Sequence, residues 1–212
     1  MLKDVTSSPD VDRIRAREAD ILGHEPRVPP MEPAEYSPEA VTMTNELRVA
    51  FGLPPNVPPP EYIATVLRHP ALFRHHNALA VHLVANGALG QRDRELAVLR
   101  LAWLAQAPYE WGEHVGIAKR MGGITDAEIE QVLIGSTAPE WNERDRTILR
   151  VVEELLSTVM LTEETWAMVA RHLDVKQQLE LPILIGQYLG VAFLQNSLRL
   201  RLENGNEGLS AR

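Results

Sequence analysis

The sequence contains no cysteine among its 212 residues. This absence excludes disulfide bonds, thiolate metal ligands, cysteine nucleophiles and dithiol redox reactions together. Any chemistry that the chain performs therefore depends on oxygen and nitrogen groups.

Basic residues are in deficit. The chain has 21 Lys and Arg residues against 29 Asp and Glu residues, which gives a formal net charge of -8. Proteins that bind nucleic acid neutralise its phosphates with clustered Lys and Arg, and no basic stripe interleaved with aromatic residues occurs here. We therefore expect no nucleic-acid partner.

Long hydrophobic runs are also missing. The longest apolar stretch, residues 181–194, is interrupted by Pro182 and two glycines, and it is shorter than the roughly 20 residues that a membrane-spanning helix needs. Residues 1–12 are polar and acidic and lack the apolar segment of a secretory signal. These features predict a cytoplasmic protein with no membrane partner.

The residues that are present favour a sizeable all-α domain. Hydrophobic residues make up 45% of the chain and charged residues 24%, which is enough apolar surface for a core. Thr125 and Glu128 have the spacing of a capping box that begins a helix, and the pair Gly122-Gly123 ends the preceding one. No stretch shows sustained period-two alternation, so we expect no sheet. The predicted helices cover residues 70–87, 93–107, 108–122, 125–135, 142–159, 162–173 and 174–202.

These signals divide the chain into three parts. Residues 1–60 are predicted to form a proline-rich, extended N-terminal arm with one short helix that begins at Ser37-Pro38. The proline cluster at residues 54–60 is a rigid, non-helical connector. Residues 61–203 form the helical domain, and residues 204–212 form a C-terminal tail.

Glu110 and His114 are the candidate pair for chemistry. They stand four residues apart, so on a helix they share one face, and a carboxylate beside an imidazole makes an acid/base pair that works near neutral pH. Glu95 lies in a helix that is otherwise mostly apolar, and it meets the pair if the two helices pack together. The alternative also stands at this point: the Glu-x-x-x-His spacing is common on solvated helix faces, and Glu95 is equally compatible with a surface position near a helix N-terminus.

The segment from Arg94-Glu95-Leu96-Ala97 through Tyr109-Glu110-Trp111 to His114 resembles the core of the carboxymuconolactone decarboxylase and alkylhydroperoxidase D-like superfamily. The likeness covers roughly residues 61–203 and implies an all-helical fold. In the peroxidase branch a Cys-x-x-Cys pair precedes the histidine; here those two positions are Ala107 and Glu110. The relay glutamate corresponds to Glu95 and the histidine to His114. The chain therefore resembles the decarboxylase branch and is not expected to be a thiol peroxidase.

The resemblance implies a cofactor-independent lyase that acts on a carboxylated lactone or an unsaturated acid from aromatic catabolism. Such a substrate delocalises the developing negative charge into its own conjugated carbonyl, so no cofactor and no metal is required. His114 is then the proton-transfer group, Glu110 its orienting group or a second acid, and Glu95 a relay.

A small anionic substrate calls for a cationic group nearby. The candidates are Arg100, Arg74, His75 and His76, although the two histidines are adjacent on a helix and cannot both face one pocket. Tyr109 and Trp111 are candidates for the pocket wall. The resemblance adds Tyr188 as a hydrogen-bond donor.

Three alternatives remain open. The same Glu/His site serves an isomerase or hydrolase that acts on an aromatic ring-cleavage product. A metal enzyme would use Glu95, Glu110 and His114 with His75 or His76. A non-catalytic helical module is the third. The resemblance also implies a homo-oligomer, a trimer or a hexamer, and the apolar surface of residues 179–198 favours one.

Overall fold

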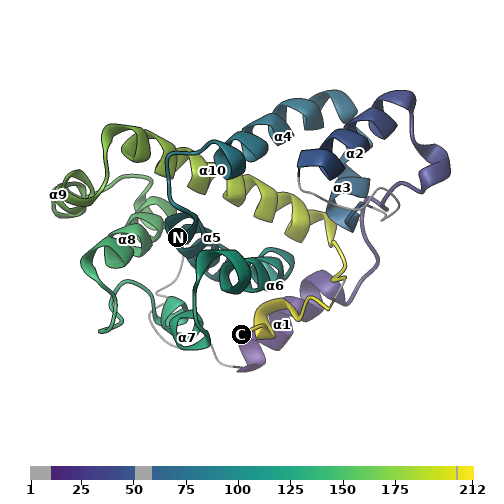
Figure 1. Cartoon of the computed structure of the whole chain (residues 1–212). Helices are drawn as coiled ribbons and strands as arrows, with labels where there is room; N and C mark the ends of the chain where they lie inside the picture. The colour runs from purple at the N-terminus through teal and green to yellow at the C-terminus, as the bar shows by residue number, and fades with distance from the viewer. Residues whose placement is uncertain (1–10, 51–58, 204) are drawn as a thin grey trace.

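The computed structural model describes residues 11–50, 59–203 and 205–212, and every regular element in those ranges is helical (Figure 1). The predicted all-α class is therefore confirmed. Residues 54–58 of the predicted connector at residues 54–60 lie outside the described residues. The elements are α1 (Val11–Leu22), η1 (Pro33–Glu35), α2 (Pro38–Ala50), α3 (Glu61–Val66), α4 (Pro70–Ala85), α5 (Gln91–Leu104), α6 (Pro108–Ile117), the π-helical turn η2 (Ala118–Gly122), α7 (Asp126–Ile134), α8 (Glu143–Thr158), α9 (Glu163–His172), α10 (Val175–Leu198) and η3 (Gly208–Ser210).

Helix α5 lies at the centre of the molecule. It packs against α6, α7, α8, α10 and η2, and all of its residues from Asp93 to Trp103 are buried. A helix that is enclosed on all sides shows no single apolar face, which is why its sequence has little helical periodicity. Trp103 on α5 and Trp111 on α6 meet in the core with their ring centroids 4.9 Å apart. This contact fixes α6, which carries Glu110 and His114, against α5.

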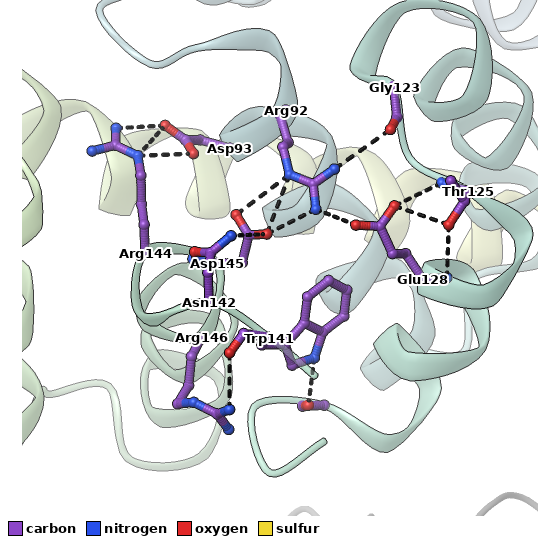
Figure 2. Close-up of polar contacts among 11 residues, drawn as sticks. Arg92, Asp93, Gly123, Thr125, Glu128, Trp141, Asn142, Arg144, Asp145 and Arg146 are labelled. Carbon is purple, nitrogen blue, oxygen red and sulfur yellow. Dashed lines mark hydrogen bonds and ion pairs between the residues drawn. The ribbon is translucent and has the colours of Figure 1, made fainter. Parts of the chain in front are cut away.

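The charged residues at the start of α5 are compensated by ion pairs, which Figure 2 shows. Arg92 donates to Asp145 at 2.8 Å and to Glu128 at 2.5 Å, so it joins α5 to α8 and to the first turn of α7. Asp93 pairs with Arg144 at 2.7 Å. Because a buried charge is costly unless it is paired, these contacts allow a charged helix start to sit in the interior.

Glu128 is also the last residue of the predicted capping box, and the structure confirms this box. Thr125 Oγ1 accepts from the Glu128 amide, and the Glu128 carboxylate accepts from the Thr125 amide at 2.8 Å. Burial favours a higher pKa for the Glu128 carboxyl, but its bonds to Arg92 and Thr125 outweigh burial and lower the pKa below its ordinary value. A carboxyl whose pKa is lowered by folding stabilises the protein above its unfolded pKa, and this stabilisation is lost as the pH falls through the folded pKa.

We therefore expect Glu128→Gln to reduce the free energy of unfolding at pH 7 and to have a smaller effect at an acid pH below the lowered folded pKa, where the wild-type carboxyl is protonated too. Urea unfolding at the two pH values measures this difference. Glu163→Gln, at an exposed position in the first turn of α9, is the matched control. An equal loss of stability at both pH values would contradict the assignment.

Helices α2, α3 and α4 form a second, smaller apolar cluster beside the main core. Its buried members are Ala40, Met43, Leu47, Leu67 and Phe73. Helix α4 connects the two parts because it packs against both α2 and α10. The candidate site lies between them.

The prediction of an extended N-terminal arm is wrong for residues 11–22, which form α1. Ile21 is buried, Arg17 donates to the carbonyl of Gln106, and Glu18 accepts from the amide of Leu209. The prolines that suggested an extended arm begin only at residue 26, so they do not interrupt this helix.

The C-terminal residues 205–212, predicted as a tail outside the helical domain, pack against α1 and α6 (Figure 1). Leu209 is fully buried, Trp111 Nε1 donates to the carbonyl of Ala211 at 3.0 Å, and Asn206 donates to the carbonyl of Tyr109 at 2.9 Å. Asn206 occupies the space beside Gly112, where a side chain would collide with it. The two ends of the described chain therefore support the helix that carries the candidate site.

Helix α10 is long and apolar enough, by length and composition alone, to cross a membrane. The core helix of a protein in water meets the same criteria, and α10 packs against α4, α5 and α6. It also carries the polar residues Glu180, Gln187 and Gln195. Its length and hydropathy are therefore weak evidence for a membrane segment.

Candidate active site

Helix α6 places Glu110 and His114 together. The helix begins at Pro108, whose ring favours the first helical position, and the four-residue spacing then brings the two side chains onto one face. His114 Nε2 lies 3.4 Å from Glu110 Oε1, and both residues are buried. The solvated-face alternative is therefore wrong for this pair.

Glu95 reaches the same point from α5. Its Oε2 lies 2.8 Å from His114 Nδ1, and its Oε1 accepts from Arg94 Nε at 3.3 Å. Glu95 is buried, so the surface alternative is wrong for this residue as well. The structure thus brings Glu95, Glu110 and His114 together, with Arg94 behind Glu95.

The two glutamates have opposite pKa shifts. Burial raises the pKa of the Glu110 carboxyl, and the opposing influence of His114 and Gln195 does not cancel it. Burial also favours a higher pKa for Glu95, but His114 and Arg94 outweigh it and the Glu95 pKa is lowered. For His114, burial disfavours the charged ring, yet the carboxylate of Glu95 raises the imidazole pKa above its ordinary value. These directions keep Glu95 ionised to lower pH and keep Glu110 and His114 protonated to higher pH than the free side chains.

Two residues of α10 complete the surroundings of the pair. Gln195 Nε2 donates to Glu110 Oε2 at 2.6 Å, and the Tyr188 ring meets the His114 ring edge to face at 5.2 Å. These contacts hold Glu110 and His114 in single orientations, so Nε2 of His114 stays beside Glu110 while Nδ1 is bound to Glu95.

A pocket of about 470 Å³ opens onto this group, lined by residues from α2, α3, α4, α6, η2 and α10. Glu110 and His114 lie at its buried end, while Arg120 is an exposed residue of its lining. Its other walls are largely apolar and include Leu47, Phe73 and Val191. A pocket of this size accommodates a small organic molecule.

Residues 70–154 match the model of the carboxymuconolactone decarboxylase family. This segment contains the whole of α5 and α6, and with them Glu95, Glu110 and His114. No curated protein matches the sequence.

Solved structures share the fold of residues 70–154 and of the helices around them. One is the AhpD core of an uncharacterized peroxidase-related protein from Ralstonia eutropha JMP134, which has a TM-score of 0.70 and 18% identity over 85% of this chain and 94% of its own. Another is a cysteine-to-alanine variant of the debrominase Bmp8 in complex with 2,3,4-tribromopyrrole, with a TM-score of 0.68 and 17% identity over 83% of this chain and 91% of its own. At these identities the likeness establishes the AhpD-like fold alone.

The pocket includes some of the predicted substrate-binding residues. Tyr188, Tyr109 and His76 all line it. The Tyr109 hydroxyl is already used, because it donates to Glu203 at 2.7 Å. His76 contacts Gln187 at 3.2 Å, and burial lowers its pKa, so its ring is neutral near pH 7.

Other predicted binding residues lie elsewhere. Trp111 is fully buried in the core against Trp103. His75 is exposed on α4 and does not line the pocket, because adjacent residues of a helix point in different directions. Arg74 is also outside the lining, and it pairs with Glu39 at 3.5 Å on the surface.

Arg100 is the clearest correction to the expected binding residues. It does not line the pocket, and its side chain is 3% exposed. Its guanidinium donates to the carbonyls of Val132 and Leu133, at the end of α7, and to Glu153 at 2.9 Å. Position 100 is five residues beyond Glu95 on a helix that is buried all round, so it faces α7 and α8 rather than the site.

Four residues of the site were not found by sequence reasoning: Tyr62, Arg120, Gln187 and Gln195 all line the pocket. Among the described residues, the buried Tyr62 hydroxyl and Gln195 Oε1 have no hydrogen-bond partner. Burial raises the pKa of the Tyr62 hydroxyl, as does the nearby Glu110, which keeps the phenol protonated as a hydrogen-bond donor. No local pattern marks these positions, because they come from α3, η2 and α10.

The described residues contain no group of three or more His, Asp or Glu side chains arranged to hold a metal ion. In the trio around His114, Nδ1 is bound to Glu95, which leaves only Nε2 and Glu110 on the side of the pocket. The metal-enzyme alternative therefore gains no support from this geometry.

Proposed function

We propose that this chain is a cofactor-independent acid/base enzyme that transfers protons at a carbon atom of a small organic acid. Decarboxylation of a carboxylated lactone or an unsaturated acid from aromatic catabolism is the reaction we favour. The main support for the proposal is one observation. The buried imidazole of His114 lies between Glu95 and Glu110, whose pKa values are shifted in opposite directions, at the end of a mostly apolar pocket. Paired groups with separated pKa values are typical of acid/base sites.

Each of the three residues has a distinct part in this proposal. Glu95, ionised and supported by Arg94, accepts from His114 Nδ1–H and so fixes the tautomer and the orientation of the ring. His114 Nε2 and the protonated Glu110 are then the proton donors on the pocket side. Glu95 does not reach the substrate in this arrangement and acts through His114.

The proposed decarboxylation needs no further group. The bond between the carboxylate carbon and the neighbouring carbon breaks, its electron pair moves into the conjugated carbonyl of the substrate, and carbon dioxide leaves. The resulting enolate takes a proton at carbon from His114 or Glu110, and water returns that proton to the site. The Tyr62 hydroxyl, which lines the same pocket and lacks a partner among the described residues, is a suitable donor to the enolate oxygen.

Thiol peroxidase activity does not fit this chain, because its sequence has no cysteine to form the reactive pair. Glu110 stands where the resemblance places the second thiol. A carboxyl at that position supports proton transfer in place of redox chemistry.

The proposal is tested by incubating the protein with muconolactones and aromatic ring-cleavage acids in D₂O, followed by mass spectrometry and NMR. We expect loss of carbon dioxide and one deuterium on a carbon of the resulting enolate, either the carbon that carried the carboxylate or the carbon next to the conjugated carbonyl. A product of unchanged mass apart from deuterium, with shifted vinyl protons, would identify an isomerase at the same site. Addition of water would identify a hydrolase. No turnover with any member of the panel would count against the proposal.

We expect Glu110→Gln to lower kcat by about 10²-fold or more, because the amide keeps the size of the side chain but cannot transfer its proton. In the wild type, kcat should fall as the pH rises through the raised pKa of Glu110, and this alkaline decrease should weaken in the variant. A pH–rate profile of both proteins measures this. Glu163→Gln on α9, outside the pocket, serves as the control; an unchanged profile in Glu110→Gln would remove Glu110 from the proton-donor role.

The proposal includes a homo-oligomer. Val175, Leu179 and Ile183 are spaced four residues apart along α10, and each is more than half exposed, which makes an apolar stripe on the surface of a single chain. Stripes of this kind are typical of protein–protein interfaces. Light scattering that gives the mass of one chain would contradict the expectation of a trimer or hexamer.

A further inference from the structure

The exposed part of the pocket carries an arginine that makes no ion pair. Arg120, in the turn η2, lines the pocket, is exposed, and forms no hydrogen bond or ion pair with the part of the chain that the structure describes. Arg92, Arg100 and Arg144 instead bind carboxylates at 2.7 to 2.9 Å. Arg120 is thus a charged group at the edge of a site, with its donors available.

The backbone around Arg120 directs its side chain along α6. A Cβ atom at Gly116 would lie 3.0 Å from Arg120 Nη1, so the guanidinium folds back over the bare backbone of this glycine. Glu113 and Ile117, which also line the pocket, are the neighbouring positions on α6. The π-helical geometry of residues 118–122 changes the direction of side chains at the end of the helix, and such turns are frequent at functional sites.

The other cationic and imidazole side chains of the pocket lining already contact protein groups, whereas Arg120 forms no hydrogen bond or ion pair with the described residues. His76 is neutral because burial lowers its pKa, and it contacts Gln187. Arg48 donates to Asn45 at 3.0 Å. His114 is engaged by Glu95 and Glu110. Glu113 also lines the pocket, so a ligand of high negative charge, such as a phosphate, is disfavoured relative to a carboxylate.

We propose that Arg120 binds a carboxylate of the ligand at the exposed part of the pocket, while the other end of the ligand reaches His114 and Glu110. A guanidinium binds a carboxylate through two parallel hydrogen bonds, which fixes both the position and the orientation of the acid. The carboxylate held by Arg120 is therefore separate from the carbon that is protonated. This inference rests on the proposed function for the identity of the reacting end, but the binding of a carboxylate is tested without turnover.

The test uses cis,cis-muconate and its uncharged dimethyl ester as probes, with calorimetric titration of the wild type, Arg120→Ala, Arg120→Lys and Arg171→Ala. Arg171 is an exposed arginine of α9 that does not line the pocket, so its variant is the matched control. We expect Arg120→Ala to weaken muconate binding about 10- to 100-fold, the scale of a charge-assisted hydrogen-bonded pair. Arg120→Lys should recover part of the loss, and the ester should bind weakly to every protein. Gly116→Ala should weaken muconate binding as well, because its methyl group displaces the guanidinium.

Several results would overturn the inference: equal affinity of the wild type and Arg120→Ala for muconate, equal affinity of the wild type for acid and ester, or no binding of muconate up to about 10 mM. His114→Ala separates this inference from the proposed function. If Arg120→Ala weakens muconate binding both in the wild type and in the His114→Ala background, Arg120 binds the carboxylate even if no substrate is turned over. If turnover occurs and Arg120→Ala leaves both KM and muconate binding unchanged, the proposed function stands and this inference fails.

Discussion

His114→Ala should lower kcat by about 10²- to 10⁴-fold, the range that a positioned acid/base group contributes. His114 is the residue that contacts both carboxyl groups of the site, at 2.8 Å from Glu95 and 3.4 Å from Glu110. Its removal deletes the proposed proton carrier and leaves two acidic side chains without the cation between them. We expect this to be the largest effect of any single substitution on catalysis.

The measurement is steady-state turnover of the reactive acid, with circular dichroism to show that the variant is folded. His75→Ala, at an exposed position of α4 outside the pocket lining, is the matched control and should retain wild-type activity. Glu95→Gln should reduce kcat with little change in KM, since Glu95 acts through the orientation of His114. If His114→Ala retained activity within about threefold of the wild type, the proposed site would be wrong.

Arg100→Ala should cause the largest loss of stability, about 3–5 kcal/mol, because it removes a buried guanidinium that pairs with the partly buried Glu153 and donates to two carbonyls at the end of α7. Among the described residues, Glu153 then keeps only its bonds from Ser136. For a chain of this size that loss of stability corresponds to a Tm decrease of roughly 6–20 °C. The sequence suggested Arg100 as a substrate-binding residue. In the structure it instead holds α7 and α8 against α5.

Thermal and urea unfolding measure this loss, and KM at a temperature where both proteins are folded decides between the two roles. We expect KM to be unchanged. Arg74→Ala, which removes an exposed arginine from surface ion pairs, should cost less than about 1 kcal/mol. A stable Arg100→Ala protein with a raised KM would restore Arg100 as a substrate-binding residue.

The predictions that held depend on short stretches of sequence. The capping box at Thr125, the glycine pair at the end of η2 and the four-residue spacing of Glu110 and His114 are all local, because helix geometry converts spacing directly into a shared face. Two of the predicted substrate-binding residues that lie outside the pocket also have a common explanation. Arg100 and Trp111 lie in or beside the fully buried α5, where every face meets protein and no periodicity tells which face meets the pocket.

No local sequence pattern marks the residues that surround Glu110 and His114 in the pocket. Tyr62, Arg120 and Gln195 are separated by 58 and 75 positions in the sequence, yet they line one pocket. The helical arm at residues 11–22 and the packed residues 205–212 were missed for a similar reason, since their order comes from contacts with α6 and with each other. Tertiary packing supplies the free energy for such segments, and it depends on partners that are distant in the chain.

By itself, then, the absence of cysteine determined that this chain has no thiol chemistry, and the spacing of Glu110 and His114 determined that the two share a helix face. Only the tertiary structure decided that Glu95 meets His114 at 2.8 Å, that burial separates the pKa values of the two glutamates, and that the pocket has an arginine in its exposed wall. The physical reason is that residue type and helix geometry are local properties, whereas burial, charge pairing and the shape of a pocket exist only when separate helices pack together.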